Sequence, residues 1–192
     1  SSLSAQDSSS ERLLVLLRDA SALAIVDPVS GSVLGRVQTG NDPHEVTATP
    51  DGRLAFVASP SDGISVIDLV TQQEIRRINP GQGSGPHDVL YVDGKIYFTI
   101  EGYKSIARYD PETDEIDWTL GIGQESTHTF ALGADSATIF MANRRSNTIT
   151  MAEGVLGGPS ETTLSVIPVP GDFPEAIDVS PEKNTNNLKV LK

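Results

Sequence analysis

The chain repeats itself with a period of about 42 residues, and its three histidines share one position of that repeat. They are His44, His87 and His128, which lie 43 and 41 residues apart. A fourth copy of the same phrase, Pro174-Glu175-Ala176-Ile177, carries Glu175 at that position. A period of roughly 20–50 residues indicates one supersecondary unit that is stacked or arranged radially. The repeat therefore predicts an architecture in which equivalent side chains come from neighbouring units.

Each copy predicts four short strands joined by turns. In the copy that begins at His44, Pro50-Asp51-Gly52 is typical of a hairpin turn, because Asp and Gly tolerate the positive φ of such turns. Short runs of Val, Ile and Phe follow at 54–58 and 64–68, and 74–78 carries charges on one face like an edge strand. Together with 17 Gly and 12 Pro, this pattern predicts an all-β fold.

The two ends of the chain complete the count of strands. Residues 13–17, 23–27 and 33–37 predict the second, third and fourth strands of a copy whose first strand is missing, and 173–180 predict a first strand. We therefore expect a β-propeller of four-stranded antiparallel blades, with four blade equivalents and the first blade split between the two ends. The expected blades are 11–40, 41–83, 84–125 and 126–172 with a closing strand at 173–182, between a disordered tail at 1–10 and a polar tail at 183–192.

Two propeller families share the repeat's phrases. Pro43-His44-Glu45-Val46, the Pro-Asp-Gly turn and Val66-Ile67-Asp68 resemble the bacterial YVTN-type propeller repeat. Gly85-Pro86-His87-Asp88-Val89 is similar to repeats of virginiamycin B lyase-type propellers. Both resemblances imply a ring that usually has seven blades, whereas four are encoded here. Three explanations stay open: a closed four-bladed ring, two copies that build eight blades, and a piece of a seven-bladed protein.

The repeated histidine position is the candidate site. First strands line the channel of a propeller, so His44, His87, His128 and Glu175 are expected to meet at its mouth and to bind a ligand there. His44, His87 and His128 could also hold a divalent metal, because neutral imidazoles are zinc ligands. The alternative is structural, with each histidine bonded to the backbone of the neighbouring blade.

Composition excludes several functions. A net charge of −12 and a pI near 4.5 argue against nucleic-acid binding, which needs clustered Lys and Arg. No apolar run is long enough for a membrane span, no Cys is present, and no Gly-x-Ser-x-Gly elbow or phosphate-binding loop occurs. The start, Ser1-Ser2-Leu3-Ser4-Ala5-Gln6, is similar to the cleavage end of an export signal, which favours an extracytoplasmic location, with a plain tail as the alternative.

Two functions from different classes fit these observations. The first is an exported binding module that recognises a small ligand or a protein at the channel mouth. The alternative is a metal-dependent lyase or lactonase-type enzyme that uses the ring of histidines. The lyase resemblance implies a catalytic His and a metal-binding Glu, which do not map onto particular positions here, so the catalytic residues stay unassigned. An unclosed ring would expose strand edges, so we expect a homodimer or a self-assembling scaffold in that case.

Overall fold

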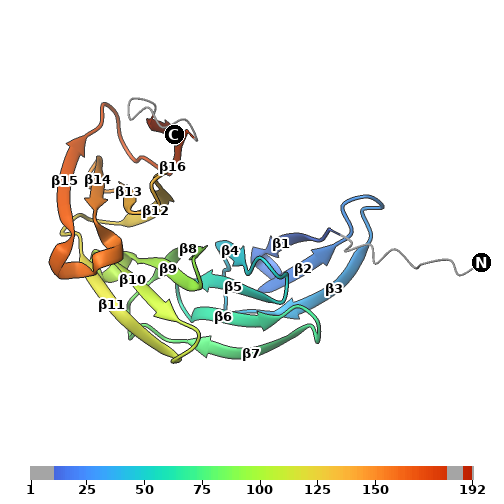
Figure 1. Cartoon of the computed structure of the whole chain (residues 1–192). Coiled ribbons are helices and arrows are strands. Elements are labelled where there is room, and N and C mark those ends of the chain that lie inside the picture. The colour runs from blue at the N-terminus through green and yellow to red at the C-terminus, as the bar shows by residue number, and fades with distance from the viewer. Residues whose placement is uncertain (1–10, 181–187, 192) are drawn as a thin grey trace, which may run out of the picture.

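The computed structural model describes residues 11–180 and the strand at 188–191, and it shows antiparallel sheets placed side by side along an arc (Figure 1). The first sheet holds β1 (Leu13–Leu17), β2 (Ala22–Val26) and β3 (Val33–Gln38). Three four-stranded sheets follow: β4 (Glu45–Ala48), β5 (Leu54–Ser59), β6 (Gly63–Asp68) and β7 (Gln73–Ile78); β8 (Pro86–Val92), β9 (Lys95–Ile100), β10 (Ser105–Asp110) and β11 (Glu115–Gly121); β12 (Thr127–Leu132), β13 (Thr138–Asn143), β14 (Thr148–Glu153) and β15 (Thr163–Pro168). A last sheet pairs β16 (Ala176–Val179) with β17 (Leu188–Leu191).

The predicted fold class is confirmed, because each sheet is a blade of a β-propeller. The helical elements of the described residues are single 3-10 turns: Arg18–Ala20, Glu101–Tyr103, Val155–Gly157 and Pro159–Glu161. The inner strands β4, β8, β12 and β16 are neighbours in space. The second strand of each blade also contacts the inner strand of the next blade, in the pairs β1 with β4, β5 with β8, β9 with β12, and β13 with β16. These contacts place the start of each inner strand beside the end of the previous second strand.

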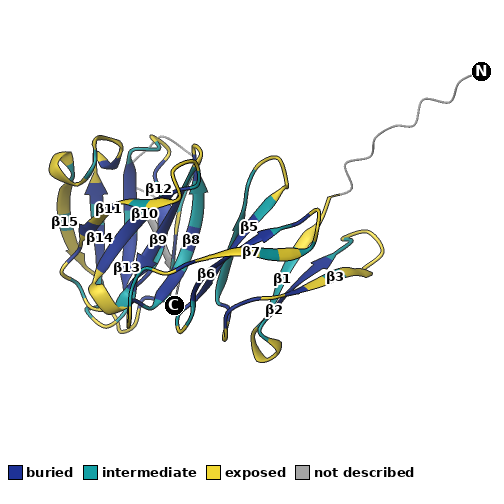
Figure 2. Ribbon diagram, turned by 90° about the horizontal axis from the view of Figure 1, so that it is seen from below, coloured by how far each residue is buried: buried dark blue, intermediate teal, exposed yellow. Residues whose placement is uncertain are grey.

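Apolar side chains between consecutive blades form the core. The middle strands of each blade are buried and the outer strands and loops are exposed (Figure 2). Phe56 and Phe98, both fully buried, belong to the cluster between the second and third blades. Ile106 and Met141 play the same part between the third and fourth blades. Burial of large apolar side chains is the main stabilising contribution, and here it holds one blade against the next.

Polar contacts between inner strands add to this packing. The Thr47 hydroxyl accepts a hydrogen bond from the Tyr91 N–H over 3.1 Å, and the Asp88 carboxylate accepts one from the Phe130 N–H over 2.8 Å. The Thr129 hydroxyl donates to the Glu175 carbonyl over 2.8 Å. Each of these bonds joins one blade to the next, so the positions of successive inner strands are fixed relative to one another.

The predicted split of the first blade is not confirmed. β16 pairs with β17, and the sheet that contains β1 has three strands among the described residues. The two ends of the arc lie apart, so the described residues do not form a closed four-bladed ring (Figure 1). Ile177 of β16 instead packs against Ala142 and Ile149 of the fourth blade.

Within the predicted closing strand, β16 therefore starts a fifth blade instead of completing the first, and 188–191 form a strand where a polar tail was expected. A partner only a few residues further along the chain closes a shorter loop than β1 would, which costs less chain entropy. The predicted tail at 1–10 and the rest of the predicted tail at 183–192 lie outside the described residues.

Candidate functional site

The histidines sit where the inner strands begin, and two of them lie at β-bulges. The register of β8 on β9 shifts between Pro86 and Val89, and that of β12 on β13 shifts between Thr127 and Thr129. A bulge inserts an extra residue that turns its side chain away from the regular alternation of the strand. His87 and His128 lie within these shifts, and His44 directly precedes β4.

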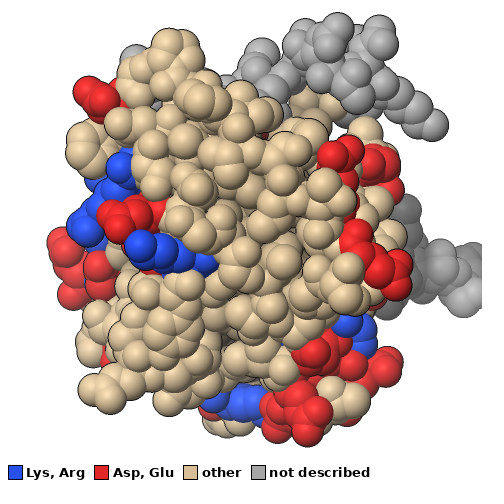
Figure 3. All heavy atoms as spheres, turned by 90° about the vertical axis from the view of Figure 1, so that its left-hand side faces the viewer, with Lys and Arg blue, Asp and Glu red and all other residues tan. Residues whose placement is uncertain are grey.

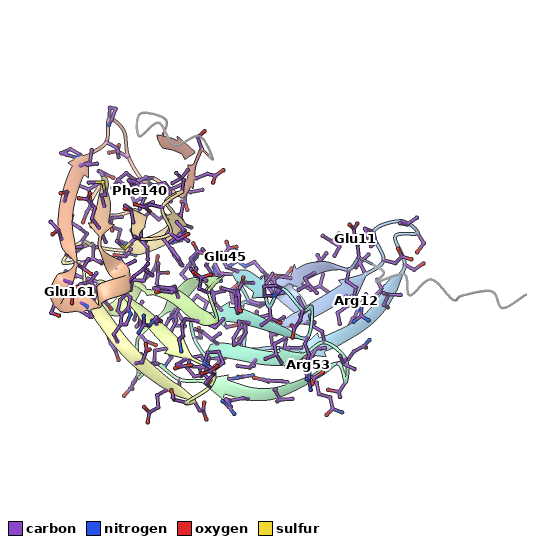
Figure 4. The ribbon with its side chains drawn as sticks, in the orientation of Figure 1. Glu11, Arg12, Glu45, Arg53, Phe140 and Glu161 are labelled. Atoms are coloured by element: carbon purple, nitrogen blue, oxygen red, sulfur yellow. The ribbon has the colours of Figure 1, made fainter. Side chains whose placement is uncertain are left out.

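The three imidazoles form a continuous row, which we call the histidine row. The ring centroids of His44 and His87 are 4.5 Å apart with the rings at 61°, and those of His87 and His128 are 3.8 Å apart at 38°. His87 and His128 are buried, at 7% and 8% exposure, whereas the side chain of His44 is 19% exposed. Glu45, which follows His44, lies on the inner side of the arc (Figure 4). The predicted meeting of the histidines therefore occurs, even though the described residues form no closed ring.

Carboxylates hold the His128 end of the row. Nδ1 of His128 lies 2.6 Å from Glu101 Oε1, and Nε2 lies 3.0 Å from Glu175 Oε2. Both nitrogens can donate to ionised carboxylates only when the imidazole carries two protons. Arg144 Nε lies 2.7 Å from Glu175 Oε1, so Glu175 sits between His128 and Arg144. The predicted residues His128 and Glu175 are thus joined directly.

His44 is held by the backbone of its own loop. Its Nδ1 lies 2.7 Å from the Asp42 carbonyl oxygen, which can only accept, so Nδ1 carries the proton and Nε2 keeps a lone pair in the neutral ring. The Asp42 carboxylate in turn accepts a hydrogen bond from Nε of Arg18 over 2.6 Å. His44 is therefore the member of the row whose ring is set up to accept a hydrogen bond.

His87 lacks such a partner. Its Nδ1 is buried and has no hydrogen-bond partner among the described residues. Burial lowers the pKa of His87, and together with the neighbouring His128 and His44 it brings that pKa to about 3. A neutral imidazole with an unpaired buried nitrogen is uncommon, because buried polar atoms are nearly always hydrogen-bonded.

Two carboxyl groups next to the row are also perturbed. Burial raises the pKa of Asp88 to about 7, against the hydrogen bonds that its oxygens accept from the Val89 and Phe130 N–H groups. Burial likewise raises the pKa of Glu45, although His44 and His128 oppose the shift. The histidine row thus lies beside two carboxyl groups, Glu45 and Asp88, whose pKa values are raised by burial and also depend on the charges of their neighbours.

The row is not arranged as a metal site. Among residues 11–180 and 188–191, no group of three or more His, Asp or Glu side chains is placed to hold a metal ion. The rings of His44, His87 and His128 stack edge and face against one another, so their nitrogens do not converge as metal ligands must. The alternative of histidines bonded to the backbone of the next blade is not seen either, since Thr47, Asp88 and Thr129 make those bonds.

Sequence reasoning missed the partners of the row: Asp42, Glu101, Arg18 and Arg144. Glu101 and Arg144 each follow directly on the second strand of a blade and reach the inner residue of the next one. The sequence did carry a signal, because Arg18, Glu101 and Arg144 share one repeat position. That signal can be interpreted only once the packing of β9 on β12 and of β13 on β16 is known.

Solved structures confirm the class of protein as a β-propeller. The chain is similar to a functionally unknown protein from Desulfotomaculum acetoxidans, with a TM-score of 0.73 and 14% identity over 94% of this chain and 65% of that one. It is also similar to virginiamycin B lyase from Staphylococcus aureus, with a TM-score of 0.72 and 18% identity over 90% of this chain and 58% of the lyase. A streptogramin B lyase structure gives a TM-score of 0.72 and 16% identity over 93% of this chain and 58% of that one. The chain thus spans about three fifths of the length of these propellers.

A family model described as the cytochrome D1 heme domain matches residues 8–104, just over half of the chain. The chain belongs to this family. No curated protein sequence matches it closely. The YVTN-type resemblance stays a prediction, while the likeness to virginiamycin B lyase holds at the level of the fold. The described residues contain no helix of the length and apolarity that crossing a membrane requires.

The family raises the question of heme, and the histidine row does not fit it. A heme iron needs an imidazole nitrogen that is free on the side of the porphyrin. Both nitrogens of His128 face carboxylates, and Nδ1 of His87 is buried. A porphyrin inserted between two imidazole rings would need those rings to be about 7 Å apart, which is twice the contact distance of roughly 3.5 Å. The ring centroids of neighbouring histidines are only 3.8 and 4.5 Å apart, so a porphyrin does not fit between them.

His44 keeps Nε2, but it stands beside Asp42 and Glu45, whose carboxylates would repel heme propionates. The nearby cations Arg18 and Arg144 are already ion-paired, with Asp42 and Glu175. These residues therefore provide no heme site of their own.

Opposite pH dependences of stability are expected from His87 and Asp88. The folded state favours neutral His87, so its stabilisation is present above pH 6.5 and is lost as the pH falls toward 3. The folded state favours protonated Asp88, so its stabilisation is present below pH 3.8 and is lost as the pH rises to about 7. Each group contributes a slope of at most about 1.4 kcal/mol per pH unit.

We expect His87→Gln to lose less stability than the wild type on acidification below pH 6.5, and Asp88→Asn to lose less as the pH rises to 7. Urea unfolding at pH 4, 5, 6, 7 and 8 measures both profiles. Each variant serves as the control for the other, because their differences from the wild type have opposite signs. Three parallel profiles would contradict the assignment.

Proposed function

We propose that this chain is part of an exported β-propeller binding module and that the histidine row contacts a small ligand at the channel mouth. The observation that carries this proposal is the assembly of His44, His87, His128 and Glu175 from four consecutive blades into one contiguous polar group. A buried imidazole without a partner is costly for folding alone. A ligand that hydrogen-bonds to it would recover that cost.

Binding fits the row better than acid–base catalysis does. A general base works best when its pKa lies near the working pH and its lone pair faces the substrate. The pKa of His87, lowered to about 3, makes it a weak base. His128 has both nitrogens engaged by Glu101 and Glu175. The His44 ring retains an Nε2 lone pair that none of its described contacts uses.

Small aromatic probes of opposite charge test the binding proposal. We expect benzoate or benzylammonium to shift the ring signals of the histidine row in NMR spectra of histidine-labelled protein. His44→Gln and His128→Gln variants assign the signals, and denatured protein serves as the control for non-specific effects. If neither probe moves any of the three ring signals, the row does not bind small ligands and the proposal fails.

A metal-dependent lyase is the second candidate. It is favoured by the two similar propellers that are named as lyases and by the Nε2 lone pair of His44. Elemental analysis of the purified wild type and of His87→Ala separates the two candidates. We expect the wild type to hold less than one metal ion per chain, because the row does not present converging ligands. A stoichiometric metal that is lost in His87→Ala would support the lyase instead.

Self-association is the third part of the proposal, because the described arc exposes unpaired strand edges, among them β15. β15 carries no charged residue, and its Leu164, Val166 and Ile167 are exposed. The side of the molecule on which β15 lies shows a broad area without Lys, Arg, Asp or Glu (Figure 3). Uncharged, apolar edge strands are the ones that pair with other chains, whereas β7 is protected by Glu74, Arg76 and Arg77.

Light scattering should therefore report particles of more than one chain, whose mass falls with dilution. Val166→Lys on β15 should shift them toward single chains, because a charge on the edge opposes pairing. Ile75→Lys on β7, which replaces an apolar residue that is also exposed, should leave the mass unchanged. A single-chain mass for the wild type at every concentration would contradict self-association.

A further inference from the structure

Residues at one repeat position pair with residues near the start of the inner strand of the next blade. That position is the residue that directly follows the second strand of each blade: Arg18, Pro60, Glu101 and Arg144. In every case two more residues follow, and then one with a positive φ: Ser21 at 48°, Gly63 at 96°, Lys104 at 51° and Asn147 at 55°. The four loops thus share length and backbone shape, so the four residues are structurally equivalent.

Three of the four residues reach across to the next blade. Arg18 binds Asp42, two residues before His44, and the atoms are 2.6 Å apart. Glu101 binds His128 over 2.6 Å, and Arg144 lies 2.7 Å from Glu175. Each pair joins a basic side chain to an acidic one, and the pairing follows from the contact of each second strand with the next inner strand.

Pro60 is the exception. Its side chain has no polar atom, and the inner residue one blade further on is His87. His87 follows Pro60 by 27 residues, just as His128 follows Glu101 by 27 (87 − 60 and 128 − 101). β5 contacts β8 as β9 contacts β12. The missing side chain therefore explains why Nδ1 of His87 is unpaired while Nδ1 of His128 is bound.

We propose that Pro60 reserves Nδ1 of His87 for the carboxylate of a ligand, which takes the place that Glu101 occupies beside His128. This inference rests on the proposed binding function and names its ligand class. In the neutral ring, Nδ1–H donates a hydrogen bond to the carboxylate, so no further proton is required. Pro60 is a specificity-determining residue in this scheme, since it decides which imidazole stays free.

The charges around His87 favour an anion over an ammonium group. The charged groups that act on His87 are His128, His44 and Arg144, which are positive when protonated, and Glu101, which is negative. A carboxylate placed at Nδ1 would be attracted by Arg144, and also by His128 and His44 where these are protonated, whereas Glu101 would repel it. An ammonium group would meet the opposite balance.

Three forms of the protein and two probes test the proposal. Benzoate should shift the His87 ring signals of the wild type and of Pro60→Leu, whose side chain also lacks polar atoms, while benzylammonium, of similar size and opposite charge, should leave them unchanged. In Pro60→Glu the chain's own carboxylate should bind Nδ1, as Glu101 does at His128. Benzoate affinity should then fall about tenfold or more, which corresponds to the loss of one charge-assisted hydrogen bond.

The outcomes separate this inference from the binding function itself. If benzylammonium and not benzoate shifts His87, or if benzoate binds Pro60→Glu as tightly as Pro60→Leu, the inference is wrong although the row binds ligands. If neither probe shifts any histidine, the binding function and the inference both fail. Should Pro60→Glu not fold, the comparison of benzoate with benzylammonium on the wild type and Pro60→Leu still decides the ligand class.

Discussion

The contact of each second strand with the inner strand of the next blade governs the whole structure. It buries the apolar faces of both sheets, as the clusters around Phe56 and Phe98 and around Ile106 and Met141 show. It also brings the inner residues of consecutive blades together, which places His44, His87 and His128 within stacking distance. Because the contact is local to each pair of blades, the row forms without closure of the ring.

This locality explains what the sequence could and could not predict. The strands could be predicted from turn residues such as Asp51 and Gly52 and from the short runs of valine and isoleucine. Turns and strands of this kind depend on residues that are close together in the sequence. The repeat position identified the histidines as neighbours. The partner of β16 could not be predicted, because pairing with β17 or with β1 depends on which edge is nearer in space.

The fine structure of the site also depends on tertiary packing. The roles of Glu101 and Arg144 could not be predicted from the sequence, because their partners, His128 and Glu175, lie in the following blade. The bulges at His87 and His128 change the direction of both side chains, and strand alternation alone gives no sign of them. The stacking of the rings, and hence the lack of converging metal ligands, follows from these bulges. The same stacking leaves no room for a porphyrin between the rings of the histidine row.

The cross-blade pairing has a consequence for how such chains can diversify. An inner residue and its partner belong to different blades, as Glu101 and His128 do. A blade that is duplicated or exchanged on its own therefore arrives without the residue that satisfied it, and it offers its own loop residue to a new neighbour. New combinations of charge around the inner strands can thus arise when whole blades are rearranged, without any point mutation in the inner strands.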